Sequence, residues 1–169
     1  MLHADIPKWF AVYTRSRAEK KVARELEKKG IECYLPLYKT IRQWSDRRKK
    51  VEEPLIRSYT FVRIVNKEYL PVLQTDGVVN IVSFSGQPVP VPDWQIQNLK
   101  ILLGAETEFN HEAEEFEKGQ EVLIGGGPLR GLRGIVINKK GIHKLVISIS
   151  ALNYNITLDI NPRFVQPVA

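Results

Sequence analysis

Apolar residues recur at strand and helix spacing from the start of the chain. The segment WFAVYT, residues 9–14, is aromatic and β-branched, so it predicts a first strand. Ser16 and Glu19 then have the spacing of a capping box, and apolar residues at every fourth position predict a helix that ends at Gly30. The chain therefore opens with a strand followed by an amphipathic helix.

The next segment predicts a β-hairpin. Residues 31–44 are strand-like and reach the turn pair Ser45-Asp46, after which residues 47–56 return. The returning strand starts with four adjacent cations, Arg47, Arg48, Lys49 and Lys50. These charges repel one another, so a polyanion is their natural partner, with solvation of an exposed tip as the alternative.

Four further elements follow the hairpin. They are a strand over 58–65, a short helix over 67–75, a strand over 78–84 and a helix over 92–103. The resulting order β, α, β, β, β, α, β, α predicts an α+β domain with one largely antiparallel sheet flanked by helices.

An acidic segment divides the chain. Residues 104–117 contain six glutamates and no lysine or arginine, which is typical of a solvated linker. We therefore predict a domain over 1–103, a linker over 104–117 and a second domain over 118–169.

The second domain opens on a glycine-rich segment, KGQEVLIGGGPLRGLRG, residues 118–134. Several glycines beside a proline indicate sharp backbone reversals, and the flanking β-branched residues indicate strands. A phosphate-binding loop is disfavoured, because the expected lysine is missing and Gly134 leads into a strand. A small β-barrel is the favoured interpretation, and a generic barrel with no partner remains an alternative.

Composition narrows the function further. The formal net charge is +6 with a pI near 9.4, which predisposes a protein to bind polyanions. No signal peptide or membrane-length apolar run is present, so we expect a cytoplasmic protein without membrane contact. One cysteine and three histidines exclude an internal disulfide and make a metal site improbable. No catalytic spacing is recognisable either, so we expect no enzyme activity and no cofactor.

The glycine-rich segment resembles the KOW motif of the NusG and Spt5 transcription factors and of several ribosomal proteins. The matching residues are Gly119, Gly127, Pro128, Gly131 and Gly134. The resemblance implies a five-stranded KOW β-barrel that associates with RNA polymerase or the ribosome.

The first domain resembles the N-terminal domain of NusG-type elongation factors. The segments that carry this resemblance are residues 9–36, the hairpin with EEPLIRSYTFVRI, and DGVVNIVSFSGQPVPVPD. Within the family, WSDRRKKVEEPLIRSYTFVR is most similar to the specialised UpxY group, beside RfaH and LoaP. UpxY-type proteins prevent premature termination in capsular polysaccharide operons, so the resemblance implies an operon-specific antiterminator, with a general NusG-like factor as the alternative.

The NusG resemblance also implies a polymerase contact. In the family, a hydrophobic depression grips the β′ clamp helices of RNA polymerase, and aromatic residues make good anchors there. The matching positions are Tyr13, Tyr59, Phe61, Phe84 and Ile96. Ordinary core packing is the alternative for these side chains, Phe61 above all. Glu68 to Leu70 occupy the place of the contact with the β gate loop, but they lack the polar, threonine-rich character that RfaH has there.

Cations near the first helix join those of the hairpin tip in a predicted nucleic-acid surface. The set is Arg15, Arg17, Lys20, Lys21, Arg24, Arg47, Arg48, Lys49 and Lys50. The resemblance implies non-template or upstream DNA as the ligand, with nascent leader RNA as a further candidate. For the cations near the first helix, the alternative is that they form a solvated surface without a ligand.

In relatives, apolar loop tips of the KOW domain bind partners, among them a ribosomal protein. The corresponding positions are Leu129, Leu152, Asn153 and Tyr154, where the general factor's phenylalanine-glycine-arginine sequence is absent. β-branched residues and the Gly-Pro density predict a domain that stays β-structured and does not inhibit the first domain. We expect a monomer. A KOW protein that acts on the ribosome or on RNA remains the alternative from another class.

Overall fold

The aromatic and β-branched residues of the predicted first strand lie in a sheet that packs one face against helices. A computed structural model describes residues 6–105, 107–112, 119–139 and 141–168. It divides the chain into two compact units, one up to Pro90 and the other from Val91. The division lies ahead of residue 103, so the helix over 93–104 groups with the second unit.

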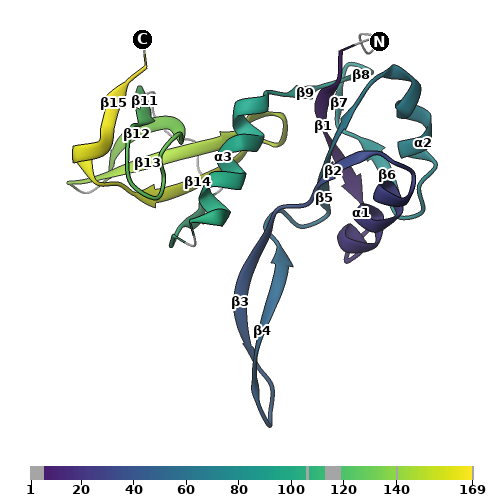
Figure 1. Cartoon of the computed structure of the whole chain (residues 1–169), viewed down its shortest axis with the longest axis horizontal. Helices are drawn as coiled ribbons and strands as arrows, with labels where there is room; N and C mark the ends of the chain where they lie inside the picture. Colours follow the sequence, from purple (N-terminus) through teal and green to yellow (C-terminus); the bar gives the residue numbers. More distant parts are fainter. Residues whose placement is uncertain (1–5, 106, 113–118, 140, 169) are drawn as a thin grey trace. The chain divides into compact units, whose positions relative to one another are not determined.

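Antiparallel pairing builds the sheet of the first unit (Figure 1). Four of its strands run in the order β2-β5-β1-β6, with bounds β1 Lys8–Thr14, β2 Glu32–Tyr34, β5 Tyr59–Ile64 and β6 Val78–Ile81. The short strand β9 (Pro90–Val91) also pairs with β1. Helices α1 (Glu19–Lys28) and α2 (Tyr69–Leu73) belong to this unit, with a 3-10 turn, η1 (Asn66–Glu68), before α2. The predicted α+β class is confirmed.

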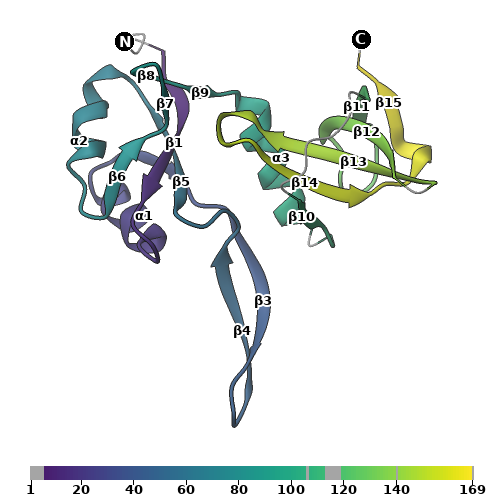
Figure 2. The same ribbon diagram turned by 180° about the vertical axis from the view of Figure 1, so that it is seen from behind.

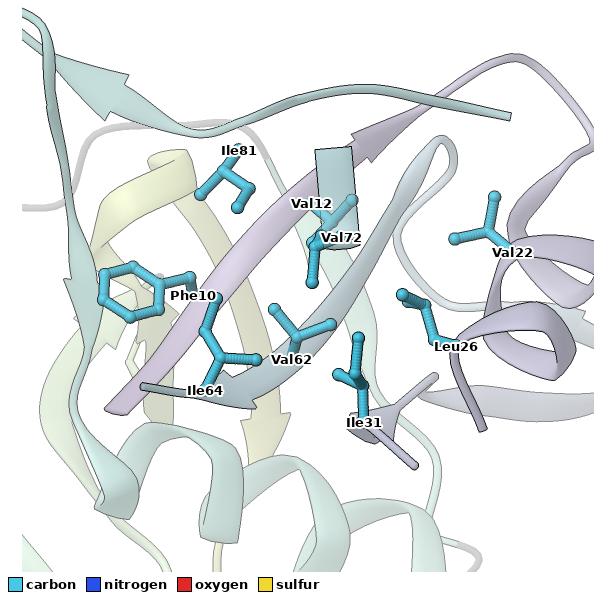
Figure 3. Close-up of a cluster of buried hydrophobic side chains, with 9 residues drawn as sticks. All are labelled: Phe10, Val12, Val22, Leu26, Ile31, Val62, Ile64, Val72 and Ile81. Atoms are coloured by element: carbon cyan, nitrogen blue, oxygen red, sulfur yellow. The ribbon is translucent and has the colours of Figure 1, made fainter. Parts of the chain in front are cut away.

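Side chains that alternate along β1 and β5 form a core with both helices (Figure 3). Successive strand residues point to opposite faces, so one parity of each strand meets α1 and α2. The buried members are Phe10, Val12, Val22, Leu26, Ile31, Val62, Ile64, Val72 and Ile81. The other parity, which includes Tyr13 and Tyr59, consequently lies on the opposite face.

The start of α1 differs from the prediction, while its end agrees. Helix α1 begins at Glu19 after Ala18, with no side-chain cap, so the predicted Ser16 capping box is wrong. The cause is Arg17, whose φ of 62° breaks the path from Ser16 into the helix. Gly30 ends the helix as predicted: it has a φ of 74°, and the Ile31 amide donates to the Leu26 carbonyl at 3.0 Å.

Two small sheets complete the first unit, and β8 (Gln87–Pro88) is the one of their four strands that was not predicted. The hairpin consists of β3 (Leu37–Gln43) and β4 (Arg48–Pro54), which pair only with each other among the described residues. Figure 1 shows it as a ribbon apart from the main sheet. The second small sheet pairs β7 (Ser83–Phe84) with β8.

The second unit is rich in strands, as predicted. After helix α3 (Asp93–Gly104), six strands pair in the order β10-β14-β13-β12-β11-β15. Their bounds are β10 Asn110–Glu112, β11 Gln120–Ile124, β12 Arg133–Lys139, β13 Ile142–Ile149, β14 Tyr154–Asp159 and β15 Val165–Pro167, with 3-10 turns η2 (Ser150–Leu152) and η3 (Pro162–Phe164).

One strand of this sheet comes from the segment that we predicted to be a solvated linker. Strand β10 pairs with β14 through the register Asn110↔Thr157, so the sheet has six strands where five were expected. Backbone pairing, which needs no apolar side chains, accounts for a strand in so acidic a segment. Residues 106 and 113–117 of the predicted linker lie outside the described part.

Candidate functional site

Two tyrosines lie side by side on the face of the first sheet that is opposite its helices. Tyr13 on β1 is paired in register with Tyr59 on β5, and their ring centroids are 5.4 Å apart. Tyr13 is 39% exposed and Tyr59 is half-buried. A tyrosine ring offers a large, rigid contact area with a polar tip, so this Tyr13–Tyr59 pair is suited to hold a protein partner.

The other residues expected in the polymerase contact do not all join this pair. Phe61 shares the face of Tyr59 but is fully buried opposite Ala11, so the alternative of core packing applies to it. Ile96 is also buried, on α3, which groups with the second unit. Phe84 is 77% exposed, on the separate sheet β7-β8. Of these five predicted positions, only Tyr13, Tyr59 and Phe84 therefore present aromatic surface.

A buried carboxylate fixes the loops beside the Tyr13–Tyr59 pair. Oε1 of Glu19 accepts hydrogen bonds from the Arg17 amide at 3.2 Å and the Ser58 amide at 3.1 Å. Both donors have left-handed backbone conformations, with φ of 62° and 67°, which non-glycine residues rarely adopt. Glu19 thus ties the turn before α1 to the turn before β5. The sequence suggested only a helix cap for Glu19, because its long-range partner Ser58 carries no recognisable signal.

The predicted cations near α1 are all exposed, but several already have partners. Lys21 Nζ lies 2.5 Å from Asp76 Oδ2, and Arg15 lies 4.0 Å from the same carboxylate. Lys21 is the main reason that the pKa of Asp76 is below its ordinary value. Lys20 donates to the Glu52 carbonyl at 2.7 Å. Asp76 therefore offsets part of this positive surface, and Arg17 and Arg24 are its remaining cations.

The hairpin tip concentrates positive charge more strongly. Gln43 pairs with Arg48, Arg42 with Lys49 and Ile41 with Lys50. The Trp44 amide donates to the Arg47 carbonyl at 2.7 Å and closes the turn. Arg47, Arg48, Lys49 and Lys50 are exposed, and within the described ranges no carboxylate forms an ion pair with them. This is the arrangement expected of a phosphate-binding surface.

Nearer its base, the hairpin balances its charge. Arg42 forms an ion pair with Glu53, and the Tyr38 hydroxyl donates to Glu53 Oε2 at 3.2 Å. The Arg42 guanidinium is the main reason that the pKa of Glu53 is lowered. Arg42 therefore differs from the four tip cations, which have no carboxylate ion pair within the described ranges.

The glycines of the KOW-like segment have structural roles in strands β11 and β12, at their ends and in the turn between them. Gly127 and Gly131 have φ of 76° and 95°, a conformation that costs other residues strain. Gly119 and Gly134 allow close backbone approach, since a Cβ on Gly134 would lie 2.4 Å from the Val146 carbonyl oxygen. Pro128 is exposed between them. The segment thus builds the strand connection.

The predicted partner loops of the second unit lie in two different connections. Leu129 is half-buried in the turn after β11, whereas Leu152, Asn153 and Tyr154 span the connection from β13 to β14. Asn153 has a left-handed φ of 49° and is exposed. Tyr154 lines a narrow space against α3 together with Leu99.

Helix α3 packs on the strands of the second unit (Figure 2). Buried side-chain amides of the helix form part of this contact. The Asn98 side chain donates to the Arg133 carbonyl at 2.7 Å and accepts from the Arg133 amide at 3.0 Å. Gln95 Nε2 donates to the Ser150 hydroxyl at 3.1 Å. The Arg133 guanidinium lies 4.9 Å from the centre of the Trp94 ring. These polar contacts explain why α3 groups with the second unit.

The described residues offer little for metal or thiol chemistry. No group of three or more His, Cys, Asp or Glu residues gathers in them at a distance suited to a metal ion. Burial raises the pKa of the Cys33 thiol to about 11, although a hydrogen bond with Thr60 lowers it in part. No helix in the described part combines the length and apolar character needed to cross a membrane.

Known proteins resemble this chain over nearly its whole length. Residues 7–100 match the family described as NusG, transcription termination factor. The NusG transcription termination/antitermination protein of Rickettsia typhi is 23% identical over 93% of this chain and 88% of its own length. That of Borreliella burgdorferi is 24% identical over 76% and 80%. A solved structure of Thermotoga maritima NusG, 24% identical, covers 96% of this chain and 98% of its own with a TM-score of 0.52, so the folds are alike.

Proposed function

This chain belongs to the NusG family of transcription termination and antitermination factors, and from that membership we propose that it binds RNA polymerase and suppresses pausing and termination. The Tyr13–Tyr59 pair carries this proposal, because it is an exposed aromatic surface on the domain that matches the family. Phe84 is a candidate extension of that surface. The activity is proposed to be cytoplasmic.

The proposed mechanism is a shift between two states of the polymerase clamp. A factor that binds the closed clamp more tightly than the open one favours the closed state by the ratio of its two affinities. A tenfold preference corresponds to about 1.4 kcal/mol. The β′ clamp helices are the proposed contact of the Tyr13–Tyr59 pair. A second contact, to the β gate loop, would use Leu70, whose side chain is exposed. Glu68 is less available, because its carboxylate accepts a hydrogen bond from the Val65 amide at 2.9 Å.

Nucleic acid is proposed as the second ligand of the first unit. The hairpin tip would contact phosphates of the non-template strand or the upstream duplex, with Arg17 and Arg24 as additional contacts. Such contacts position the protein and carry little sequence information, so base readout must come from other side chains. Leader RNA is the alternative ligand.

The salt dependence of binding tests the role of the tip. Replacing Arg48 and Lys50 by alanine is expected to weaken binding to an elongation complex and to reduce the slope of log K against log salt by about 1 to 2, since each lost phosphate contact removes about 0.7 to 0.9. Affinity measured between low and moderate salt gives this slope. The charge-matched control is the pair Lys28→Ala and Arg63→Ala, whose side chains already form ion pairs with Glu25 and Glu32. Equal slopes for both variants would mean that the tip cations are solvated and make no phosphate contacts.

We further propose that the chain is a specialised, operon-specific factor. Its support is the UpxY-like hairpin segment and the absence of phenylalanine-glycine-arginine at residues 152–154. The capsular polysaccharide operons of the UpxY group are the proposed targets, and a ribosomal protein remains a candidate partner of the second unit.

Transcription in vitro across a terminator separates the specialised from the general factor. We expect the protein to raise read-through on a template with its native leader and to have no effect when the leader is scrambled. Equal read-through on both templates would identify a general factor. Recovery of ribosomes without polymerase from lysate would instead favour the ribosomal alternative.

A further inference from the structure

The tip of the hairpin carries exposed apolar side chains among its cations. Trp44 is 56% exposed and Ile41 is 62% exposed. Single exposed apolar residues are common on protein surfaces. Trp44 lies at the turn of a ribbon whose strands pair, in the described part of the chain, only with each other. Burying its large ring on a partner would therefore be favourable.

Register assigns these side chains to different faces of the ribbon. Residues that pair directly in an antiparallel ladder share a face, and the face alternates at each step. The Trp44 amide bonded to the Arg47 carbonyl continues the ladder by one step beyond Gln43↔Arg48. Trp44 therefore shares its face with the pair Arg42↔Lys49. Ile41 belongs to the other face, with Arg48 and Lys50.

We propose that the hairpin tip binds unpaired nucleotides, with the Trp44 indole stacked on a base and with Arg47 and Lys49 on the flanking phosphates. The inference rests on the proposed role of the hairpin in binding nucleic acid, and it specifies the class of ligand. Aromatic stacking combined with cations along the backbone is a common way to bind single strands without regard to sequence.

The combination of ring and charge favours a single strand over a duplex. In a duplex each base face is covered by its neighbours, so the indole reaches a base only where the strand is open. Phosphate contacts alone do not require an open strand. Trp44 is consequently the element that selects unpaired nucleotides.

The charges beside Trp44 also favour nucleic acid over a protein pocket. Lysine is depleted at the centres of protein interfaces, whereas arginine and tryptophan are enriched there. Here Lys49 shares the face of Trp44, and it is one of four exposed cations that begin three residues after the ring. A phosphate backbone complements this charge, whereas an apolar protein cavity would leave it without partners.

Binding of the full chain to labelled oligonucleotides tests the proposal. One mixed sequence is used as single-stranded DNA, as single-stranded RNA and as duplex DNA, at one salt concentration. We expect tighter binding to the single strands than to the duplex. Trp44→Ala should lower single-strand affinity about tenfold, within the range measured for loss of one stacked base, with little effect on the duplex. Trp44→Phe should retain most of the affinity, since it keeps an aromatic ring.

Ile41→Ala is the matched control, because it removes an equally exposed apolar side chain from the other face. It should leave single-strand affinity unchanged. The DNA and RNA arms show which kind of strand supplies the base. An unchanged single-strand affinity in Trp44→Ala, or an equal loss for single strand and duplex, would overturn the proposal.

Polymerase binding by the same variants keeps this inference separate from the proposed function. Trp44→Ala should still bind free RNA polymerase without nucleic acid. Loss of that binding with oligonucleotide affinity unchanged would assign Trp44 to a protein contact and overturn the inference. If the wild-type chain prefers single strands but never binds polymerase, the proposed function fails and the tip site stands.

Discussion

Replacing Gly134 by alanine is expected to destabilise the second unit by about 3 kcal/mol, at the upper end of the cost of overpacking. Gly134 is buried in β12, and an added Cβ would lie 2.4 Å from the Val146 carbonyl oxygen. Further atoms of Leu145 and Ile147 would be 3.1 and 3.2 Å away. The oxygen belongs to the backbone of β13, so it can retreat only if the pairing of β12 with β13 is distorted.

Urea unfolding followed by circular dichroism and Trp94 fluorescence measures this loss. Trp94 is the tryptophan of the second unit, while Trp9 and Trp44 belong to the first. Gly104→Ala is the control, because an added Cβ there meets nothing within 4 Å and α3 gains a better helix former. Its stability should be equal or higher. Equal stabilities of Gly134→Ala and Gly104→Ala would contradict the packing described for β12.

Replacing Tyr13 and Tyr59 together by alanine is expected to weaken RNA polymerase binding about 100-fold, or about 2.7 kcal/mol. The two rings contact each other, with centroids 5.4 Å apart, so each also orders the other. Their effects should therefore not add, and either single variant should lose much of the affinity. Binding of the full chain to purified polymerase gives the measurement.

Two controls accompany the tyrosine variants. Tyr13→Phe with Tyr59→Phe keeps both rings and should retain most of the affinity. Ile142→Ala removes an exposed apolar side chain from the second unit and should leave it unchanged. Folding of the double alanine variant is checked by its unfolding midpoint. Full affinity in a folded double variant would exclude this pair from the polymerase surface.

Local patterns predicted most elements of the first unit. The aromatic and β-branched segments 9–14 and 58–65 became β1 and β5, and Gly30 ended α1 because a left-handed residue continues the chain there. The hairpin followed from its Ser45-Asp46 turn. These signals lie within a few residues of one another, so the sequence alone reveals them.

Tertiary contacts decided the features that sequence did not predict. Glu19 binds the amide of Ser58, which is 39 positions away, instead of capping its own helix. Asn98 and Gln95 look like polar positions of an amphipathic helix, yet their amides are buried against the second unit. Tyr59 and Phe61 are two residues apart and share one face of β5, but Phe61 is fully buried whereas Tyr59 is half-buried. Side-chain type alone contains none of this information.

The most direct test of the central proposal is transcription in vitro with purified host RNA polymerase, across a pause site and a terminator on the native leader. The wild-type chain should shorten the pause and raise read-through, and the folded Tyr13→Ala, Tyr59→Ala variant should give the values seen without added protein. A wild-type chain with no effect, or a double variant as active as the wild type, would contradict the proposal that this factor acts on polymerase through the Tyr13–Tyr59 pair.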